Sequence, residues 1–458
     1  MSLIESGVNT LNSVAFLTLG CKVNSYETEA IKKLFEDEDF TVVDFSEKAD
    51  VYVINTCTVT NIADRKSRQM LHKARKLNEH AIVVAVGCYA QAAGEVLKED
   101  EAIDIVIGNN RKKDIIHILK EYVYGETLID TIIDINKETE YEELSIESVA
   151  EKTRAYIKIQ DGCNQFCSYC IIPYARGRVR SRREDDVMKE VKSLVAQGYK
   201  EIVLTGIHLS SYGVDFNNKD EFTEDALNME HNLLNLIVEL STIDGLMRIR
   251  LGSLEPRIIT EKFVKTLSSN DKLCPHFHLS LQSGSNATLK RMNRRYNATE
   301  YLEKCNLLRK YFKNPAITTD VIVGFPGETE EEFLETKEFV DTVNFASMHI
   351  FKYSIRKGTK AATMKEQVKD EIKTDRSNQL MELEKDMSYA YKEGFIGSIE
   401  KVLIEESVEL NGKVYQTGHN ERYVKLGFES EKDYTNEVVN VKVLGLLNKD
   451  IMFCEIMD

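Results

Sequence analysis

The sequence is short of proline, of long apolar runs and of a basic leader, and each shortage excludes a class of protein. Only 5 Pro accompany 23 Gly in 458 residues, which excludes a collagen-like or low-complexity polymer. The longest apolar stretch, 81–93, has about a dozen residues, well short of the roughly 20 that a membrane-spanning helix needs. Glu5 stands near the start where a secretory leader has basic residues, so we expect no signal peptide and a cytoplasmic protein.

The composition is that of a globular protein with more than one domain. The chain is 42% hydrophobic and 29% charged, and its length favours two or three domains. Because the net charge is −15, any contact with nucleic acid must use a local basic surface. Nine cysteines, an odd number without a secretory signal, favour reduced thiols that act as ligands or pack in the core.

Regions with different patterns follow one another along the chain. Residues 14–125 alternate apolar runs with helical stretches, as a parallel βαβ sheet does, and an acidic linker follows over 126–151. Residues 152–392 repeat the alternation six times, which predicts a partial barrel with its chemistry at the carboxyl ends of the strands. Short β-like runs over 393–458 are typical of a small β-barrel. The predicted fold class is α/β, with an N-terminal parallel sheet domain, a central partial (β/α)6 barrel and a C-terminal small antiparallel β-barrel.

The strongest motif is a CxxxCxxC loop directly after the first strand of the predicted barrel, formed by Cys163, Cys167 and Cys170. Three thiolates on one short loop can hold three irons of a 4Fe-4S cube and leave the fourth iron without a protein ligand. A structural zinc site is closed by four ligands, so this spacing fits zinc poorly. An open iron can instead chelate the amino and carboxylate groups of S-adenosylmethionine.

A second set of three cysteines shares a context rather than a spacing. Cys21, Cys57 and Cys88 each follow an apolar run of the first region. Because the carboxyl ends of parallel strands lie along one edge, we expect these thiols to converge on one crevice. Gly20 and Gly87 would let the backbone approach a bulky cluster closely. A single such cysteine is more often a small core residue, which is our expectation for the remaining three: Cys274, Cys305 and Cys454.

The loop resembles that of the radical S-adenosylmethionine superfamily, and the chain as a whole resembles the methylthiotransferase family in its domain order and its six cysteines. That family joins an α/β domain with an auxiliary 4Fe-4S cluster to a radical barrel and a TRAM-type RNA-binding β-barrel. The segments 18–27, 55–60 and 87–91 look like the branch acting on threonylcarbamoyladenosine at position 37 of tRNA. The isopentenyladenosine branch typically has arginine where Thr60 stands, and the branch modifying a ribosomal protein aspartate differs around Cys57.

The resemblance implies a mechanism and a set of partners. One S-adenosylmethionine methylates sulfur held at the auxiliary cluster. A second, cleaved at the radical cluster, gives a deoxyadenosyl radical that removes hydrogen from carbon 2 of the adenine. The implied cofactors are two 4Fe-4S clusters and S-adenosyl-L-methionine. The implied partners are the tRNA anticodon stem-loop, an electron donor such as a flavodoxin or ferredoxin, and a sulfur donor. The alternatives are an isopentenyladenosine or protein substrate, or a non-catalytic iron-sulfur carrier or RNA-binding protein.

Residues at the ends of the barrel strands are the candidates for cosubstrate binding. Polar residues and glycines at these positions are typical of a ligand pocket, although a single glycine is equally an ordinary turn residue. Glu255 is alternatively a plain carboxylate at a helix N-terminus. The candidate set is Tyr169, Gly206, Ser253, Glu255, Gln282 and Ser283.

Local basic segments are the candidates for RNA binding. Five arginines follow the CxxxCxxC loop of Cys163, Cys167 and Cys170, which we call the radical loop. They suit phosphate contacts: Arg176, Arg178, Arg180, Arg182 and Arg183. The basic helix around 65–76, after Cys57, is either a second contact or a solvated face. From Gly394 the tail has seven Lys or Arg against twelve Asp or Glu, so RNA binding there must use a small basic face or aromatics such as Tyr415 and Tyr423.

Overall fold

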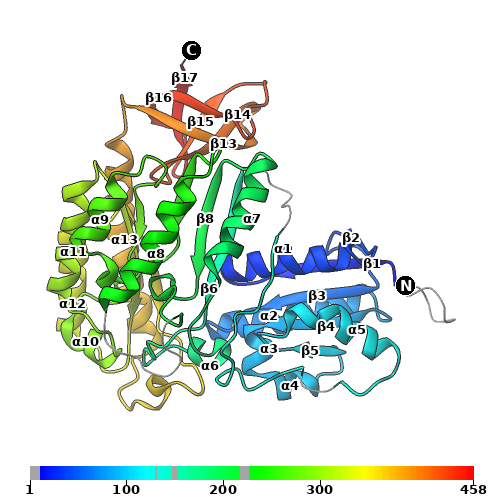
Figure 1. Cartoon of the computed structure of the whole chain (residues 1–458). Coiled ribbons are helices and arrows are strands. Elements are labelled where there is room, and N and C mark those ends of the chain that lie inside the picture. The colour runs from blue at the N-terminus through cyan, green and yellow to red at the C-terminus, as the bar shows by residue number, and fades with distance from the viewer. Residues whose placement is uncertain (1–10, 129–130, 147–152, 217–225, 458) are drawn as a thin grey trace.

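The computed structural model describes residues 11–128, 131–146, 153–216 and 226–457. The N-terminal sheet and its helices pack beside a larger group of strands and helices, and the small C-terminal barrel sits at one end of that group (Figure 1). The acidic segment that separates the first two regions is irregular over 131–146, without a helix or strand. The predicted linker residues 129–130 and 147–151 lie outside the described residues. No helix of the described part of the chain is both long and apolar enough to cross a membrane.

The N-terminal part is a five-stranded, entirely parallel sheet in the order β2-β1-β3-β4-β5. Its middle strands β3 (Val51–Thr56) and β4 (Ile82–Gly87) are buried along their whole length, because helices cover both faces. The edge strand β2 (Thr41–Val43) was not expected, since it is only three residues long and mostly exposed. The other elements are β1 (Ser13–Thr18), α1 (Lys22–Glu36), α2 (Asn61–Leu77), α3 (Cys88–Ala92), α4 (Gly94–Lys98), β5 (Ile105–Ile107), η1 (Lys112–Asp114) and α5 (Ile115–Val123).

Six parallel strands form the central part, as the sequence predicted. Three belong to the sheet β7-β6-β8-β9, whose edge strand β7 is antiparallel, and three to the sheet β10-β11-β12. Isolated parallel bridges such as Ile249 to Leu273 join the two sheets into an open, partial barrel. The strands are β6 (Arg154–Asp161), β7 (Arg180–Ser181), β8 (Glu201–Gly206), β9 (Arg248–Leu251), β10 (His276–His278), β11 (Ala316–Val323) and β12 (Ser347–Lys352).

Helices wrap the outside of these strands, and one apolar core runs through the whole of this part. They are α6 (Ile172–Arg176), α7 (Glu184–Ala196), η2 (Leu209–Ser211), α8 (Ala226–Ser241), η3 (Pro256–Ile258), α9 (Glu261–Ser268), α10 (Asn286–Arg291), α11 (Ala298–Tyr311), α12 (Glu330–Val343), η4 (Lys360–Thr363) and α13 (Asp370–Glu393). Strand β10 is only three residues long, because the chain then leaves the extended conformation and Gln282 adopts a φ of 72°.

The C-terminal part is a closed barrel in the order β13-β14-β15-β17-β16. The small barrel was predicted as antiparallel, and every neighbouring pair is antiparallel except β15 and β17, which run parallel. A core that includes Phe428 and Met452 fills its interior. The strands are β13 (Ile399–Leu410), β14 (Lys413–Asn420), β15 (Lys425–Glu429), β16 (Val438–Leu446) and β17 (Met452–Ile456).

Buried ion pairs fix the small barrel to the amino ends of β6, β8 and β9. Glu201 lies 2.5 Å from Arg154 and 2.9 Å from Arg250. Arg250 in turn donates to the backbone carbonyl of Asn420, at the end of β14. The Tyr423 ring packs against this cluster, 4.8 Å from the Arg250 guanidinium. The small barrel therefore sits at the strand edge opposite the loops that follow the carboxyl ends.

The position of the small barrel bears on the expectation that aromatic residues of the tail contact RNA. Tyr415 is only 7% exposed, so it offers no open ring to a base. Tyr423 is stacked on His419 at 4.3 Å between ring centroids and is held against the central part. Both rings stabilise the protein's own packing in this structure, and the prediction that they form a stacking surface for RNA is not supported.

Candidate functional site

The cysteines of the N-terminal sheet meet at its carboxyl edge. Cys21 precedes α1, Cys57 follows β3, and Cys88 is the first residue of α3, directly after β4. Burial raises the pKa of the Cys57 thiol to about 11, and the neighbouring Cys88 and Cys21 contribute to the rise. Burial also raises the pKa of Cys21, with a further contribution from Cys88. The three thiols thus lie close enough to influence one another's ionisation.

The two glycines of this edge allow different close contacts. Gly20 has a φ of 102°, and a Cβ there would lie 2.9 Å from Sγ of Cys57. Gly20 therefore permits the backbone to approach the Cys57 thiol closely. Gly87, with a φ of 95°, would instead place a Cβ 2.4 Å from Oδ1 of Asn55. The absence of a side chain at Gly87 therefore lets the ends of the neighbouring strands β3 and β4 approach each other. It does not bring the backbone close to a sulfur.

The cysteines of the radical loop also form one group. Burial raises the pKa of Cys163 to about 12, and the nearby Cys167 contributes to the rise. Burial raises the pKa of Cys170 further, with contributions from both of the other thiols. Hydrogen bonds from the amides of Ser168 and Asn293 to the Met292 and Phe166 carbonyls hold the loop in place. All nine cysteines of the chain are free thiols, so both groups are available as ligands.

In each of the two cysteine groups, a different arginine donates a hydrogen bond to one of the sulfurs. Arg294 Nη1 lies 3.3 Å from Sγ of Cys167, and Arg176 Nε lies 3.1 Å from Sγ of Cys88. Hydrogen bonds to ligand sulfurs help to set the properties of iron-sulfur sites. Sequence reasoning missed Arg294, because nothing in its local pattern marks it, and it assigned Arg176 to RNA.

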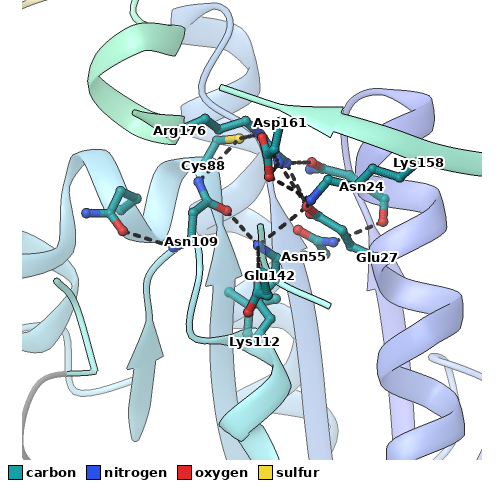
Figure 2. Close-up of polar contacts among 12 residues, drawn as sticks. Asn24, Glu27, Asn55, Cys88, Asn109, Lys112, Glu142, Lys158, Asp161 and Arg176 are labelled. Atoms are coloured by element: carbon teal, nitrogen blue, oxygen red, sulfur yellow. Dashed lines mark hydrogen bonds and ion pairs between the residues drawn. The ribbon is translucent and has the colours of Figure 1, made fainter. Parts of the chain in front are cut away.

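Arg176 belongs to a buried ion network between the first two parts of the chain (Figure 2). Its Nη1 donates to Glu27 at 2.8 Å and to Asp161 at 3.0 Å. Lys158 contacts both carboxylates, at 2.7 and 2.6 Å. Burial opposes ionisation of Glu27, but Arg176, Lys112 and Lys158 together hold its pKa below the ordinary value. The carboxylates are therefore charged and tie α1 and β6 to the radical loop.

The acidic segment contributes to the same network instead of crossing through solvent. Glu142 is 2% exposed and accepts from Lys112 Nζ at 3.3 Å and from the Lys113 amide at 3.0 Å. One residue further on, Glu143 pairs with Arg182 of the central part at 3.3 Å. The segment is thus anchored to both parts that it connects.

A second contact between these parts lies beside Cys57. Arg356, after β12, donates to Asp64 at 2.7 Å and to Asn61 at 2.9 Å, both in the first turn of α2. Its other nitrogen donates to Thr58 at 2.6 Å. Since Thr58 directly follows Cys57, this arginine fixes the position of the loop that carries the thiol.

Among the predicted cosubstrate residues, Tyr169 belongs to the radical loop itself and Glu255 lies near it. The negative charge of Glu255 contributes to the raised pKa of Cys163, which places its carboxylate near that thiol. Glu255 also caps η3, accepting from Arg257 Nε at 2.8 Å, so the alternative role as a helix N-terminal carboxylate is real. The Tyr169 ring packs edge-on against Phe325 at 6.4 Å.

The remaining candidates differ in how available they are. Gly206 ends β8 beside the Gln160 side chain, and Ser253 is exposed. Gln282 is 8% exposed and takes part in the sheet through its backbone. Ser283 is fully buried, and its hydroxyl is bonded to that of Thr336 at 3.1 Å. The Ser283 hydroxyl is therefore engaged inside the protein, and a cosubstrate contact from Ser283 stays a prediction.

His208, which the sequence did not single out, lies just after the end of β8. Burial, together with the charges of Arg294 and Arg257, lowers its pKa to about 3. The imidazole is consequently neutral at pH 7. Its backbone amide donates to Gln160 at 2.7 Å and its ring bonds to the Ser211 hydroxyl, so it is held in one orientation beside the strand ends.

The arginine run after the radical loop divides into two kinds. Arg176, Arg180 and Arg182 are at most 3% exposed, and each has a buried carboxylate within 3.9 Å. They are closed to RNA in this structure, which corrects the prediction, because the domain interface needs cations to pair with its carboxylates. Arg178 and Arg183 are exposed. Most of the basic side chains of α2 are exposed as well: Arg65, Lys66, Arg68, Lys73 and Lys76.

In the residues that the structure describes, no three His, Cys, Asp or Glu side chains are placed to hold a single metal ion. The radical loop lies in the segment 157–340, which matches the family model of the Radical SAM superfamily. The segment 13–108 matches that of the Uncharacterized protein family UPF0004. The central barrel, its cysteine loop and this match define a radical S-adenosylmethionine enzyme.

Similar proteins narrow the class further. The chain is 41% identical to the threonylcarbamoyladenosine tRNA methylthiotransferase MtaB of Bacillus subtilis, over 94% of each chain. It is 34% identical to the tRNA-2-methylthio-N(6)-dimethylallyladenosine synthase of Finegoldia magna, over 94% of this chain and 91% of that one. It also shares its fold with the radical S-adenosylmethionine methyltransferase TsrM of Kitasatospora setae, with a TM-score of 0.55, 15% identity and 77% of each chain covered. The chain belongs to the radical S-adenosylmethionine methylthiotransferase family.

Proposed function

We propose that this enzyme adds a methylthio group to threonylcarbamoyladenosine in tRNA. The observation that carries the proposal is the presence of two groups of three free cysteines in two parts of the chain that pack together. The relatives named for threonylcarbamoyladenosine are more similar to the chain, at 40 and 41% identity, than the relative named for dimethylallyladenosine, at 34%.

Each group of cysteines suits one 4Fe-4S cluster. Cys163, Cys167 and Cys170 would hold the radical cluster and leave one iron open to S-adenosylmethionine. The auxiliary cluster would be held by Cys21, Cys57 and Cys88. When bound, the two clusters supply the electron for cleavage of the cosubstrate and the site at which sulfur is held. The thiols must lose their protons to bind iron, and burial makes this costly until the metal arrives.

The protein's own residues position these groups. Arg294 and Arg176 each donate a hydrogen bond to one ligand sulfur. Glu255 offers a carboxylate near Cys163, which would suit the amino group of S-adenosylmethionine. His208 is neutral and buried, so it adds an imidazole beside these residues without adding a charge.

The domain roles follow the regions predicted from the sequence. Residues 14–125 would carry the auxiliary cluster, 126–151 would link the domains, 152–392 would form the radical core, and 393–458 would be a TRAM-like RNA-binding module. The exposed Arg178 and Arg183 beside the radical loop suit the phosphates of the tRNA anticodon stem-loop. An electron donor such as a flavodoxin or ferredoxin and a sulfur donor complete the reaction, which we place in the cytoplasm with its tRNA.

Mass spectrometry of tRNA nucleosides tests the substrate. The wild-type gene, expressed in cells without a methylthiotransferase of their own, should produce methylthio-threonylcarbamoyladenosine. The variant Cys163→Ala/Cys167→Ala/Cys170→Ala should produce none. Appearance of only methylthio-isopentenyladenosine, or of a methylthiolated ribosomal protein with unmodified tRNA, would assign the enzyme to another branch. Iron binding without production of deoxyadenosine would instead indicate a non-catalytic carrier.

A further inference from the structure

The arginine that contacts the proposed auxiliary site belongs to the radical part of the chain. Arg176 is the last residue of α6, six positions after Cys170, yet its Nε contacts Sγ of Cys88 at 3.1 Å. The backbone is fixed on either side of Arg176: the Cys163 amide donates to the carbonyl of Gly177, and the Asn109 side chain donates to the carbonyl of Ala175. A movement of the radical loop would therefore move the donor to Cys88.

The guanidinium of Arg176 is held in one orientation. Its Nη1 donates to Glu27 and Asp161, and its Nη2 donates to Asn24 at 2.8 Å and to Glu27 at 3.1 Å. The side chain is fully buried. With both terminal nitrogens committed to these partners, Nε can point only toward Cys88 (Figure 2).

Glu27 and Asp161 each have a lysine counter-charge in addition to this arginine. Glu27 has Lys158 at 2.7 Å and Lys112 at 3.5 Å, and Asp161 has Lys158 at 2.6 Å. Without its sulfur the network holds four cations against three carboxylates: Arg176, Lys158, Lys112 and Arg180 with Glu27, Asp161 and Glu142. Ionisation of Cys88 on binding iron adds a fourth negative charge, directly beside Arg176.

We propose that Arg176 is a positioning residue for the auxiliary cluster, which orients Cys88 and raises the reduction potential of the cluster. The inference rests on the proposed function, since it requires a cluster on Cys88. Hydrogen bonds to ligand sulfurs and nearby charge are among the properties that set such potentials. A fixed positive charge stabilises the reduced, more negative cluster more than the oxidised one, so its removal lowers the potential.

The test uses the full chain with Cys163, Cys167 and Cys170 changed to Ala, so that only the auxiliary cluster remains. Arg176→Gln and Arg176→Lys are introduced into this background. Arg182→Gln is the matched control, because Arg182 is equally buried at the same interface but pairs with Glu190 and contacts no cysteine. Redox titration followed by electron paramagnetic resonance and the rate of iron loss to a chelator are measured for each.

In Arg176→Gln we expect the reduced-to-oxidised ratio at a fixed potential to fall about tenfold, equivalent to about 59 mV for one electron. Iron loss should quicken by about 10- to 100-fold. Arg176→Lys retains the charge but not the directed Nε–H donor, so iron loss should quicken while the potential falls less. The control should match the background in both measurements.

Equal potentials and equal rates in Arg176→Gln and in Arg182→Gln would overturn the inference while leaving the proposed function intact. If Arg176→Gln assembles no cluster, Arg176→Lys provides the test. A reduction potential and a rate of iron loss equal to those of the background protein would then overturn the inference. If the background itself holds no iron, both this inference and the two-cluster assignment fail.

Discussion

Arg356 and Asp64 form an ion pair at 2.7 Å although they stand 292 positions apart in the chain. The pair joins the loop after β12 to the first turn of α2, beside the loop that carries Cys57. It closes the N-terminal sheet onto the radical barrel at a point distinct from the Arg176 network. Both side chains are mostly buried, at 8 and 18% exposure, so solvent screens their attraction only weakly.

Removal of this pair should loosen α2 from the barrel. A double-mutant cycle with Arg356→Ala and Asp64→Ala should give a coupling free energy of about 1 to 2 kcal/mol, because the hydrogen bond is charge-assisted. Chemical denaturation of the four proteins measures it. As a control, the cycle for the exposed pair Lys413 and Glu429 should show little coupling. A coupling near zero for Arg356 and Asp64 would show that the contact does not hold the domains together.

Iron content tests both cysteine groups at once. After anaerobic reconstitution we expect about eight irons per chain, falling to about four when Cys163, Cys167 and Cys170 are changed to Ala. The same fall is expected when Cys21, Cys57 and Cys88 are changed instead. The matched control changes the three core cysteines, Cys274, Cys305 and Cys454, and should keep about eight irons. Retention of the full count in either of the first two variants would remove that group from the site.

Stability at acid pH should depend on Glu201. The flanking Arg250 and Arg154 overcome the effect of burial and hold the Glu201 pKa well below its ordinary value of 4.5. A carboxylate whose pKa is lower in the folded state contributes stability that is present above about pH 4.5 and is lost as the pH falls further. Glu201→Gln should therefore lower the free energy of unfolding by about 3 kcal/mol at pH 7, by leaving buried arginines unpaired.

The difference between wild type and this variant should shrink as the pH falls below about 4.5. Thermal unfolding at a series of pH values from 7 to 3 measures it. Glu429→Gln, which removes an exposed partner, should behave as wild type throughout. If the difference in stability between wild type and Glu201→Gln stayed constant across the pH series, the lowered pKa of Glu201 in the folded protein would be contradicted.

RNA binding should separate the exposed arginines from the buried ones. Arg178, whose guanidinium lies 4.6 Å from the Phe166 ring, is exposed beside the radical loop. Arg178→Ala and Arg183→Ala should each weaken tRNA binding and reduce the salt dependence of the binding constant by about one counterion. Arg182→Gln should instead lower the melting temperature and leave the salt dependence unchanged. Filter binding across a range of salt concentrations decides between the two behaviours.

Much of the fold was predictable because its signals are local. Buried parallel strands such as β3 and β4 appear as unbroken apolar runs, and the six strands of the barrel were found within a few residues of their ends. The short edge strand β2 was missed, since three mostly exposed residues carry no apolar run. The single parallel pairing of β15 with β17 was also beyond prediction, because it depends on how the barrel closes.

The sequence by itself determined the two groups of cysteines. Cys163, Cys167 and Cys170 share one loop, and Cys21, Cys57 and Cys88 follow strands whose carboxyl ends must lie along one edge. Local spacing and the rules of parallel sheets suffice for such placements. The tertiary structure alone decided which arginines of the basic run are exposed and which lie in the interior. Arg176 and Arg178 look alike in a basic run, and only the packing of one domain on another buries the first against Cys88 and leaves the second exposed.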